Sequence, residues 1–327
     1  MIFDLHCDTI WKIDTARQKG ESICLKKSHL QVDEEKLIKG NYLAQCFAIF
    51  AHAHNENPYA TCMRMIDVYY DELKACENLR PAYSYQDILR NQKDKKISAI
   101  LTMEDGAPIG ESFDALHILY ERGVRMVCLL WNYVNQIGHH NRGKFLSDGR
   151  PDDITPVTDK GLTDFGKALV KEMNKKGMII DVSHLSDAGF YDVIALSDKP
   201  IIASHSNARG LCGHIRNFTD DMLYKLADNG GVMGMNYAKY FLHSDAELGK
   251  DTIAGVLAHI KYISAKIGLN NIGLGSDYDG ISTDLGMNFA DQLPRLVEAL
   301  DRAGFSTGDI EKICYRNALR VFKECLK

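Results

Sequence analysis

Short runs of apolar residues alternate with longer amphipathic segments from one end of the chain to the other. The runs are continuously apolar, which is typical of parallel strands covered on both faces. They predict eight strands, at residues 2–5, 43–50, 97–102, 124–130, 178–180, 200–203, 231–236 and 272–275. Helical periodicity fills gaps between them, at residues 60–78, 113–122, 163–176, 185–196, 219–228, 291–303 and, as a closing helix, 306–325. This alternation predicts an α/β fold, a (β/α)8 TIM barrel, with residues 1–327 as a single domain.

Polar residues mark the starts of three of these helices. Ser186, Thr219 and Ser306 each lie at the start of a helical pattern and are good N-cap residues. The Gly- and Asp-rich stretch 138–160 has no such pattern and predicts a long loop after the fourth strand. In a barrel, a loop at that place would cover the active site.

Composition narrows the class of protein. The chain has 327 residues, of which 45% are hydrophobic and 25% charged, with a formal net charge of -5. These values give no sign of binding to nucleic acid or to an acidic membrane. The chain lacks an apolar run long enough to span a bilayer and begins without a signal-like segment. Its nine cysteines are dispersed without a C-x-x-C pair, so we expect reduced thiols and a cytoplasmic location.

Histidines follow the apolar runs at two neighbouring strands. His184 comes after the run at 178–180, and His205 after the run at 200–203. Between the two runs lies a predicted helix, so both histidines lie at the carboxyl ends of barrel strands, where the chemistry of such barrels usually takes place. His6 and Asp8 end the first strand on the same side of it, whereas Cys7 points to the other side.

Carboxylates end two further strands. Glu104 follows the third strand; Asp277 and Asp279 follow the eighth, and strand alternation does not decide between these two. Imidazole suits zinc, a carboxylate can bridge two ions, and two ions roughly 3.5–4 Å apart can share a hydroxide and polarise a carbonyl. One rim therefore carries a candidate metal site made of His6, Asp8, Glu104, His184, His205 and Asp277.

One further aspartate and the remaining histidines have weaker claims to the site. Asp4 alternates with His6 and points deeper into the barrel, either as a partner of a ligating histidine or as a buried structural group. We expect the remaining histidines in loops, with the first two left open as additional site residues: His52, His54, His139, His140 and His214.

Together these motifs resemble the renal, or membrane, dipeptidase family, a zinc-dependent branch of the amidohydrolase-like barrels. The similarity covers essentially the whole chain in order, as far as the closing segment 317–322. It is carried by His6-x-Asp8, Glu104, Ser183-His184, Ser204-His205-Ser206, Arg216 and the stretch Gly275-Ser276-Asp277-Tyr278-Asp279-Gly280.

The resemblance implies two Zn2+ ions per subunit. His6 and Asp8 would bind the first ion, Glu104 would bridge, and His184 and His205 would bind the second. The resemblance also suggests a homodimer. Since the chain shows neither the leader nor the lipid-anchor signal of the animal enzymes, it looks more like a bacterial-type cytoplasmic member.

The same resemblance also implies which residues transfer the proton and which bind the substrate. Asp277 would sit beside the first ion and carry a proton from the nucleophilic water to the leaving amine. Arg216, eleven residues after His205, matches the arginine that grips the terminal carboxylate of the substrate. Animal members carry a substrate-orienting histidine just after the fourth strand, and here Trp131 and Asn132 stand at the matching place. Either these two residues shape the pocket differently, or a histidine of the following loop takes over.

The sequence thus predicts a dinuclear zinc dipeptidase that cleaves dipeptides with a free C-terminal carboxylate, with C-terminal D-residues among the candidate substrates. Two alternatives remain. Another amide or lactam hydrolase could use the same barrel, because a fold does not fix a substrate. A non-catalytic binding protein could also retain the barrel, but it would be expected to lack at least one ligand, and all six positions are filled.

Overall fold

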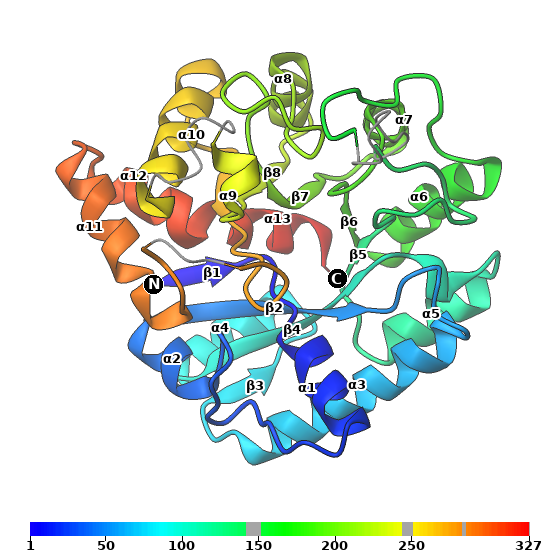
Figure 1. The fold of residues 1–327 in the computed structure, drawn as a ribbon, viewed down its shortest axis with the longest axis horizontal. Helices are drawn as coiled ribbons and strands as arrows, with labels where there is room; N and C mark the ends of the chain where they lie inside the picture. Colours follow the sequence, from blue (N-terminus) through cyan, green and yellow to red (C-terminus); the bar gives the residue numbers. More distant parts are fainter. Residues whose placement is uncertain (142–151, 244–250, 283–285, 327) are drawn as a thin grey trace.

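The computed structural model describes residues 1–141, 152–243, 251–282 and 286–326. Within these residues, eight parallel strands form a closed barrel, because β2 pairs with β4 and β9 pairs with β1 (Figure 1). The predicted fold class is confirmed. The strands are β1 (Ile2–Asp4), β2 (Tyr42–Phe50), β4 (Ile97–Glu104), β5 (Met126–Cys128), β6 (Ile179–Asp181), β7 (Ile202–Ser206), β8 (Val232–Met235) and β9 (Ile272–Leu274).

A ninth strand, β3 (Leu79–Pro81), lies outside the barrel and was not predicted from the apolar pattern. It pairs with the first three residues of β4, whereas β5 pairs with the last three. Only Leu79 of this strand is buried, so it lacks the continuous apolar run that marks the others. The barrel strands β2 and β4 are buried at every position, which is why their runs were recognisable.

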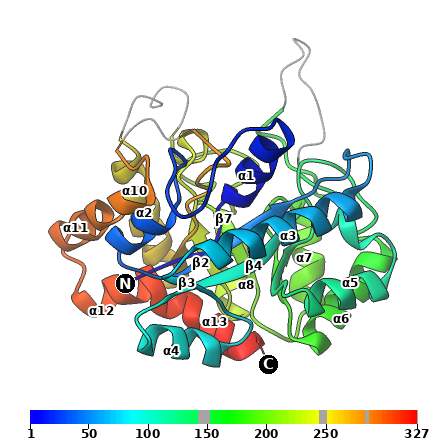
Figure 2. The same ribbon diagram turned by 90° about the horizontal axis from the view of Figure 1, so that it is seen from below.

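Helices surround the barrel (Figure 1), and Figure 2 shows α1 at one end of it, with α4 and α13 at the other. The longer helices are α1 (Thr9–Gln18), α3 (Pro58–Ala75), α4 (Tyr85–Lys93), α5 (Phe113–Glu121), α6 (Asp164–Lys176), α7 (Asp187–Leu196), α8 (Asp220–Asp228), α10 (Thr252–Ile267), α11 (Pro294–Arg302) and α13 (Asn317–Cys325). Shorter ones are α2 (Glu34–Lys39), α9 (Lys239–Leu242) and α12 (Thr307–Glu311). No helix in the described part of the chain is long and apolar enough to cross a bilayer.

The three predicted N-caps are confirmed. The hydroxyls of Ser186, Thr219 and Ser306 accept hydrogen bonds from backbone amides in the first turns of α7, α8 and α12. The closing helix at 306–325 is not one continuous α-helix. A π-helical turn, Lys312–Arg316, separates α12 from α13 and packs against β1 and β9 with Ile313 and Cys314 buried.

Candidate active site

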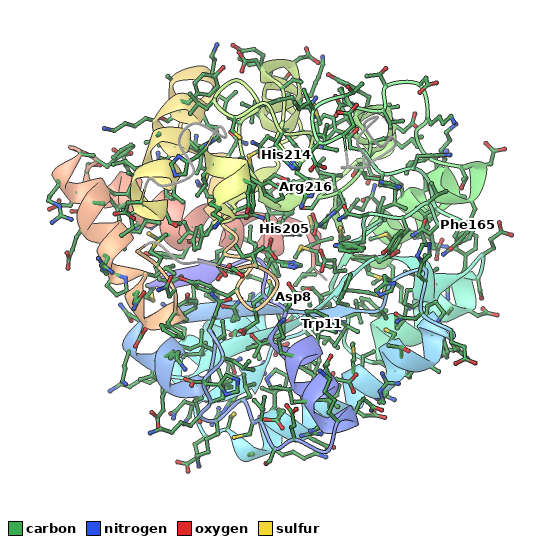
Figure 3. All side chains as sticks on the ribbon, viewed as in Figure 1. Asp8, Trp11, Phe165, His205, His214 and Arg216 are labelled. Atoms are coloured by element: carbon green, nitrogen blue, oxygen red, sulfur yellow. The ribbon has the colours of Figure 1, made fainter. Side chains whose placement is uncertain are left out.

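Six side chains meet at the carboxyl ends of five barrel strands. They follow or end β1, β4, β6, β7 and β9, and all six are buried: His6, Asp8, Glu104, His184, His205 and Asp277. Figure 3 shows Asp8 and His205 near the middle of the barrel. The side chains of His6 and Asp8 approach each other, as predicted from the alternation at this strand.

One group of ligand atoms is centred on His6. Its Nε2 lies 3.4 Å from Asp8 Oδ2, 3.6 Å from Glu104 Oε2 and 3.9 Å from Asp277 Oδ1. His6 Nε2 and Asp8 Oδ1 are buried and have no hydrogen-bond partner in the described residues. Buried polar atoms are nearly always paired, so this group has the features of a cation site.

The second group faces the other oxygen of Glu104. Glu104 Oε1 lies 3.1 Å from His184 Nε2 and 3.6 Å from His205 Nε2, and these two nitrogens are 3.0 Å apart. The carboxylate thus presents one oxygen to each group. This is the geometry required of a carboxylate that bridges two ions, and imidazole and carboxylate together are a donor set that suits zinc.

The electrostatics of the site also favour bound cations. Burial and the neighbouring charge of Asp8 raise the pKa of Glu104 to about 8. Burial and Asp8 likewise raise the pKa of Asp277 to about 7, against the attraction of His6. Burial lowers the pKa of His205 well below its ordinary value, and the nearby His6 and Arg216 lower it further. Three crowded carboxylates, beside a His205 imidazole that burial keeps neutral, fit positive ions placed between them in a dry pocket.

Asp277 and Asp279, the two aspartates after β9, make different contacts. The Asp279 carboxylate accepts hydrogen bonds from Thr9 Oγ1 at 2.6 Å, Gln31 N at 2.8 Å and Val32 N at 3.3 Å, which fix the loop after β9. Asp277 instead accepts from Asn236 Nδ2 at 2.9 Å and faces His6 with its other oxygen. Both aspartates have positive φ, 61° and 66°, so strand alternation no longer applies there.

Arg216 reaches the same pocket from the loop after β7 (Figure 3). Its side chain is buried, with Nη2 donating to His205 O at 3.2 Å and Nη1 to Ser206 Oγ at 3.4 Å. Its Nε is buried without a hydrogen-bond partner in the described residues. Arg216 lines a cavity of about 80 Å³ together with His184, Asn132 and Phe241. A cationic donor beside the ligand cluster suits an anionic group of a ligand.

Comparison with known proteins decides the family. The model of the membrane dipeptidase family, peptidase family M19, matches residues 1–327. The chain belongs to this family.

It is 37% identical to an uncharacterised protein in the pqqA 5' region of Klebsiella pneumoniae, over 75% of this chain and 88% of that one. It is 31% identical to dipeptidase aclJ of Aspergillus oryzae, over 89% of this chain and 69% of that one. A metallopeptidase from Rhodobacter sphaeroides, crystallised with a phosphinate mimic of the dipeptide L-Ala-D-Ala, has a TM-score of 0.89 at 25% identity, over 99% of both chains.

Membership makes the protein a metallo-dipeptidase, a peptide hydrolase that depends on metal and acts on a small peptide. Trp131 and Asn132, which were predicted to shape the pocket, both lie beside His184. Asn132 Oδ1 is 2.9 Å from His184 Nδ1, and the Trp131 ring centroid is 6.2 Å from that of His184. The amide therefore fixes the ring so that Nε2 faces Glu104.

A matching support for His205 was not recognised from the sequence. Ser204 Oγ donates to Asp181 Oδ2 at 2.5 Å and lies 2.7 Å from His205 Nδ1. These two hydrogen bonds, from His205 to Ser204 and from Ser204 to Asp181, orient the ring so that His205 Nε2 points into the site of this dipeptidase. Asp181 is the last residue of β6, but a strand-end aspartate alone does not reveal whether it binds metal or supports a ligand.

Asp4 Oδ1 accepts hydrogen bonds from His6 N at 3.3 Å and from Ser276 N at 2.9 Å. Of its two predicted roles, these contacts match the buried structural one. His52 and His54 are absent from the ligand cluster and stack with Tyr133 and Trp131 beside it.

The loop predicted at 138–160 lies only partly within the described residues. His139 and His140 run alongside residues 184–186, and His140 pairs with Leu185. His214 lies in a loop, as expected, and lines the Arg216 cavity. The part of the loop at 142–151, and with it the prediction that it covers the site, lies outside the described residues.

Proposed function

We propose that residues 1–327 form one catalytic domain, a dinuclear zinc dipeptidase that cleaves dipeptides with a free C-terminal carboxylate. The observation that carries the proposal is the orientation of Glu104, whose two oxygens face two separate groups of ligands. His6 and Asp8 would hold one ion, His184 and His205 the other, and Glu104 would contribute an oxygen to each. When bound, the ions would supply Lewis acidity at the peptide carbonyl and at the attacking water.

Asp277 is proposed to transfer a proton from the attacking water to the leaving amine. Its Oδ2 is held by Asn236, while Oδ1 faces His6 and the metal groups. In this position the carboxylate would take the proton of the attacking water and deliver it to the leaving amine. An aspartate so positioned serves as base in the first half of the reaction and as acid in the second.

Arg216 is proposed to bind the C-terminal carboxylate of the dipeptide. Its guanidinium is buried beside the ligand cluster, and a planar fork can bind a carboxylate through two hydrogen bonds. Trp131 and Asn132 would line the same pocket. Because the Rhodobacter sphaeroides relative was crystallised with a mimic of L-Ala-D-Ala, we include C-terminal D-residues among the proposed substrates. A homodimer is proposed from the family resemblance alone, and light scattering of the purified protein tests it.

One experiment tests the proposal as a whole. The protein is stripped of metal, titrated with zinc, and assayed on L-Ala-L-Ala, L-Ala-D-Ala, their C-terminal amides and a lactam. We expect activity to rise until two zinc ions are bound per chain, with the free-acid dipeptides as the best substrates. Saturation at one ion would contradict the dinuclear site, and preference for amides or the lactam would contradict the proposed specificity.

A further inference from the structure

The residue proposed to bind the substrate carboxylate lies on an irregular loop, between β7 and α8. Loop side chains have no helix or strand to fix their direction, yet a binding arginine must be held in place to within a fraction of an ångström. The backbone on either side of Arg216 therefore needs hydrogen bonds from elsewhere in the chain.

Arg209 provides two of these bonds. Its Nη2 donates to Ile215 O at 3.1 Å and its Nε donates to Asn217 O at 2.8 Å, so it holds the carbonyls of both neighbours of Arg216. The same guanidinium forms two bonds to Asp187, at 2.7 and 2.8 Å. Both partners of this ion pair are largely buried, with 14% and 8% of their side chains exposed.

Asn141 ties the pair to the loop after β5. Its Nδ2 donates to Asp187 Oδ1 at 2.8 Å and to Ile215 O at 3.0 Å, and its Oδ1 accepts from Val157 N at 2.9 Å. Its side chain is also buried. The carbonyl of Ile215 thus receives two side-chain donors, one from Arg209 and one from Asn141.

We infer that Arg209, Asp187 and Asn141 are positioning residues that hold Arg216 in the orientation needed to bind the C-terminal carboxylate. The inference rests on the proposed role of Arg216. None of the three lies in the ligand cluster, so they act on substrate affinity and leave the metal groups unchanged. Losing them lets the Arg216 loop shift, which weakens an interaction made equally in the ground state and the transition state.

The test substitutes Arg209→Lys and, separately, Asn141→Ala. Lysine retains the charge opposite Asp187 but cannot bond two carbonyls and two carboxylate oxygens at once. We expect the KM for a free-acid dipeptide to rise by about 10- to 100-fold with kcat little changed. The C-terminal amide of the same dipeptide should be cleaved as by the wild type, and bound zinc and Tm should confirm an intact protein.

Arg320→Lys is the matched control. Arg320 also bonds two backbone carbonyls, Gly230 O at 2.7 Å and Asn270 O at 3.2 Å, and pairs with Glu324. These carbonyls precede β8 and β9, at the end of the barrel away from the site. Arg320→Lys should leave KM and kcat unchanged for both the free-acid dipeptide and its amide.

Arg216→Ala tests the proposed role of Arg216 separately from the positioning roles of the other residues. If Arg216→Ala impairs the free acid selectively but Arg209→Lys and Asn141→Ala impair both substrates equally, or neither, the positioning inference is wrong and the proposed function stands. If Arg216→Ala itself does not distinguish acid from amide, both the carboxylate assignment and this inference are overturned.

Discussion

The choice between the two aspartates after β9 can be tested by exchanging each for its amide. Asp277→Asn preserves the shape of the side chain and an oxygen that can accept the hydrogen bond from Asn236. It removes the carboxylate that can accept and release a proton. We expect kcat to fall by about 10²–10⁴, the usual contribution of a positioned acid or base. That range corresponds to about 3–5 kcal/mol in activation free energy.

Asp279→Asn should behave differently. The Asp279 carboxylate accepts three hydrogen bonds that tie the loop after β9 to Thr9, Gln31 and Val32. An amide retains a single acceptor oxygen, so at least one buried donor loses its partner, at a cost of about 1–3 kcal/mol in stability. The measurable effect should be a lower Tm, with a smaller loss in kcat than Asp277→Asn causes.

The assay is steady-state hydrolysis of one free-acid dipeptide at saturating zinc, with bound zinc and thermal unfolding measured on the same samples. The reasoning is refuted if Asp277→Asn keeps nearly wild-type kcat while Asp279→Asn abolishes it. Loss of zinc from Asp277→Asn would instead make the residue a ligand that is required for binding, and the assignment as proton carrier would have to be given up.

Three further predictions follow from single residues. Glu104→Gln should lower zinc affinity and activity together, measured by equilibrium dialysis and hydrolysis, because the bridge loses its charge; full zinc binding without activity would contradict this. Arg216→Ala should cost about 2–4 kcal/mol in kcat/KM on free-acid dipeptides but little on amides, and Arg216→Lys should recover part of it. Burial lowers the pKa of His259 to about 4 from an ordinary 6.5, so the unfolded state binds the proton first and stability is lost as pH falls across that window. The loss is about 3 kcal/mol, and His259→Gln should show a correspondingly flatter stability curve in urea unfolding.

The barrel was predictable because its strands are buried on both faces and so appear as uninterrupted apolar runs. The same logic fails for β3, where only one of three residues is buried. It also fails for the π-helical turn before α13, because apolar spacing does not distinguish a locally widened helix from a regular one. Backbone hydrogen bonding decides such details, and neither periodicity nor composition records it.

The candidate ligands were predictable for a related reason. Each ends a strand or follows one closely, and the carboxyl ends of parallel strands meet at one rim. The residues that support these ligands were not predictable. Asp181 and Ser204 reach His205 from two strands, and Arg209 lies next to Arg216 only because the loop folds back on itself. Such contacts depend on the path of the chain in space, which a strand pattern does not contain.

The proposed metal site is also linked to the stability of the fold. His184 and Asp277 have φ values of 70° and 61°, a region in which side chains other than glycine cost of order 1–3 kcal/mol. Close beside them, Asp8 and Glu104 are buried next to each other, which is a further destabilisation without a cation. The surrounding barrel can hold this arrangement because its strands are fully buried and its ligands are fixed by Asn132 and by Ser204. Metal that binds only the folded state then stabilises that state in proportion to the logarithm of its concentration over Kd. The fold therefore holds both the strained backbone at the strand ends and the buried carboxylates in place, and a bound cation would offset the repulsion between the carboxylates.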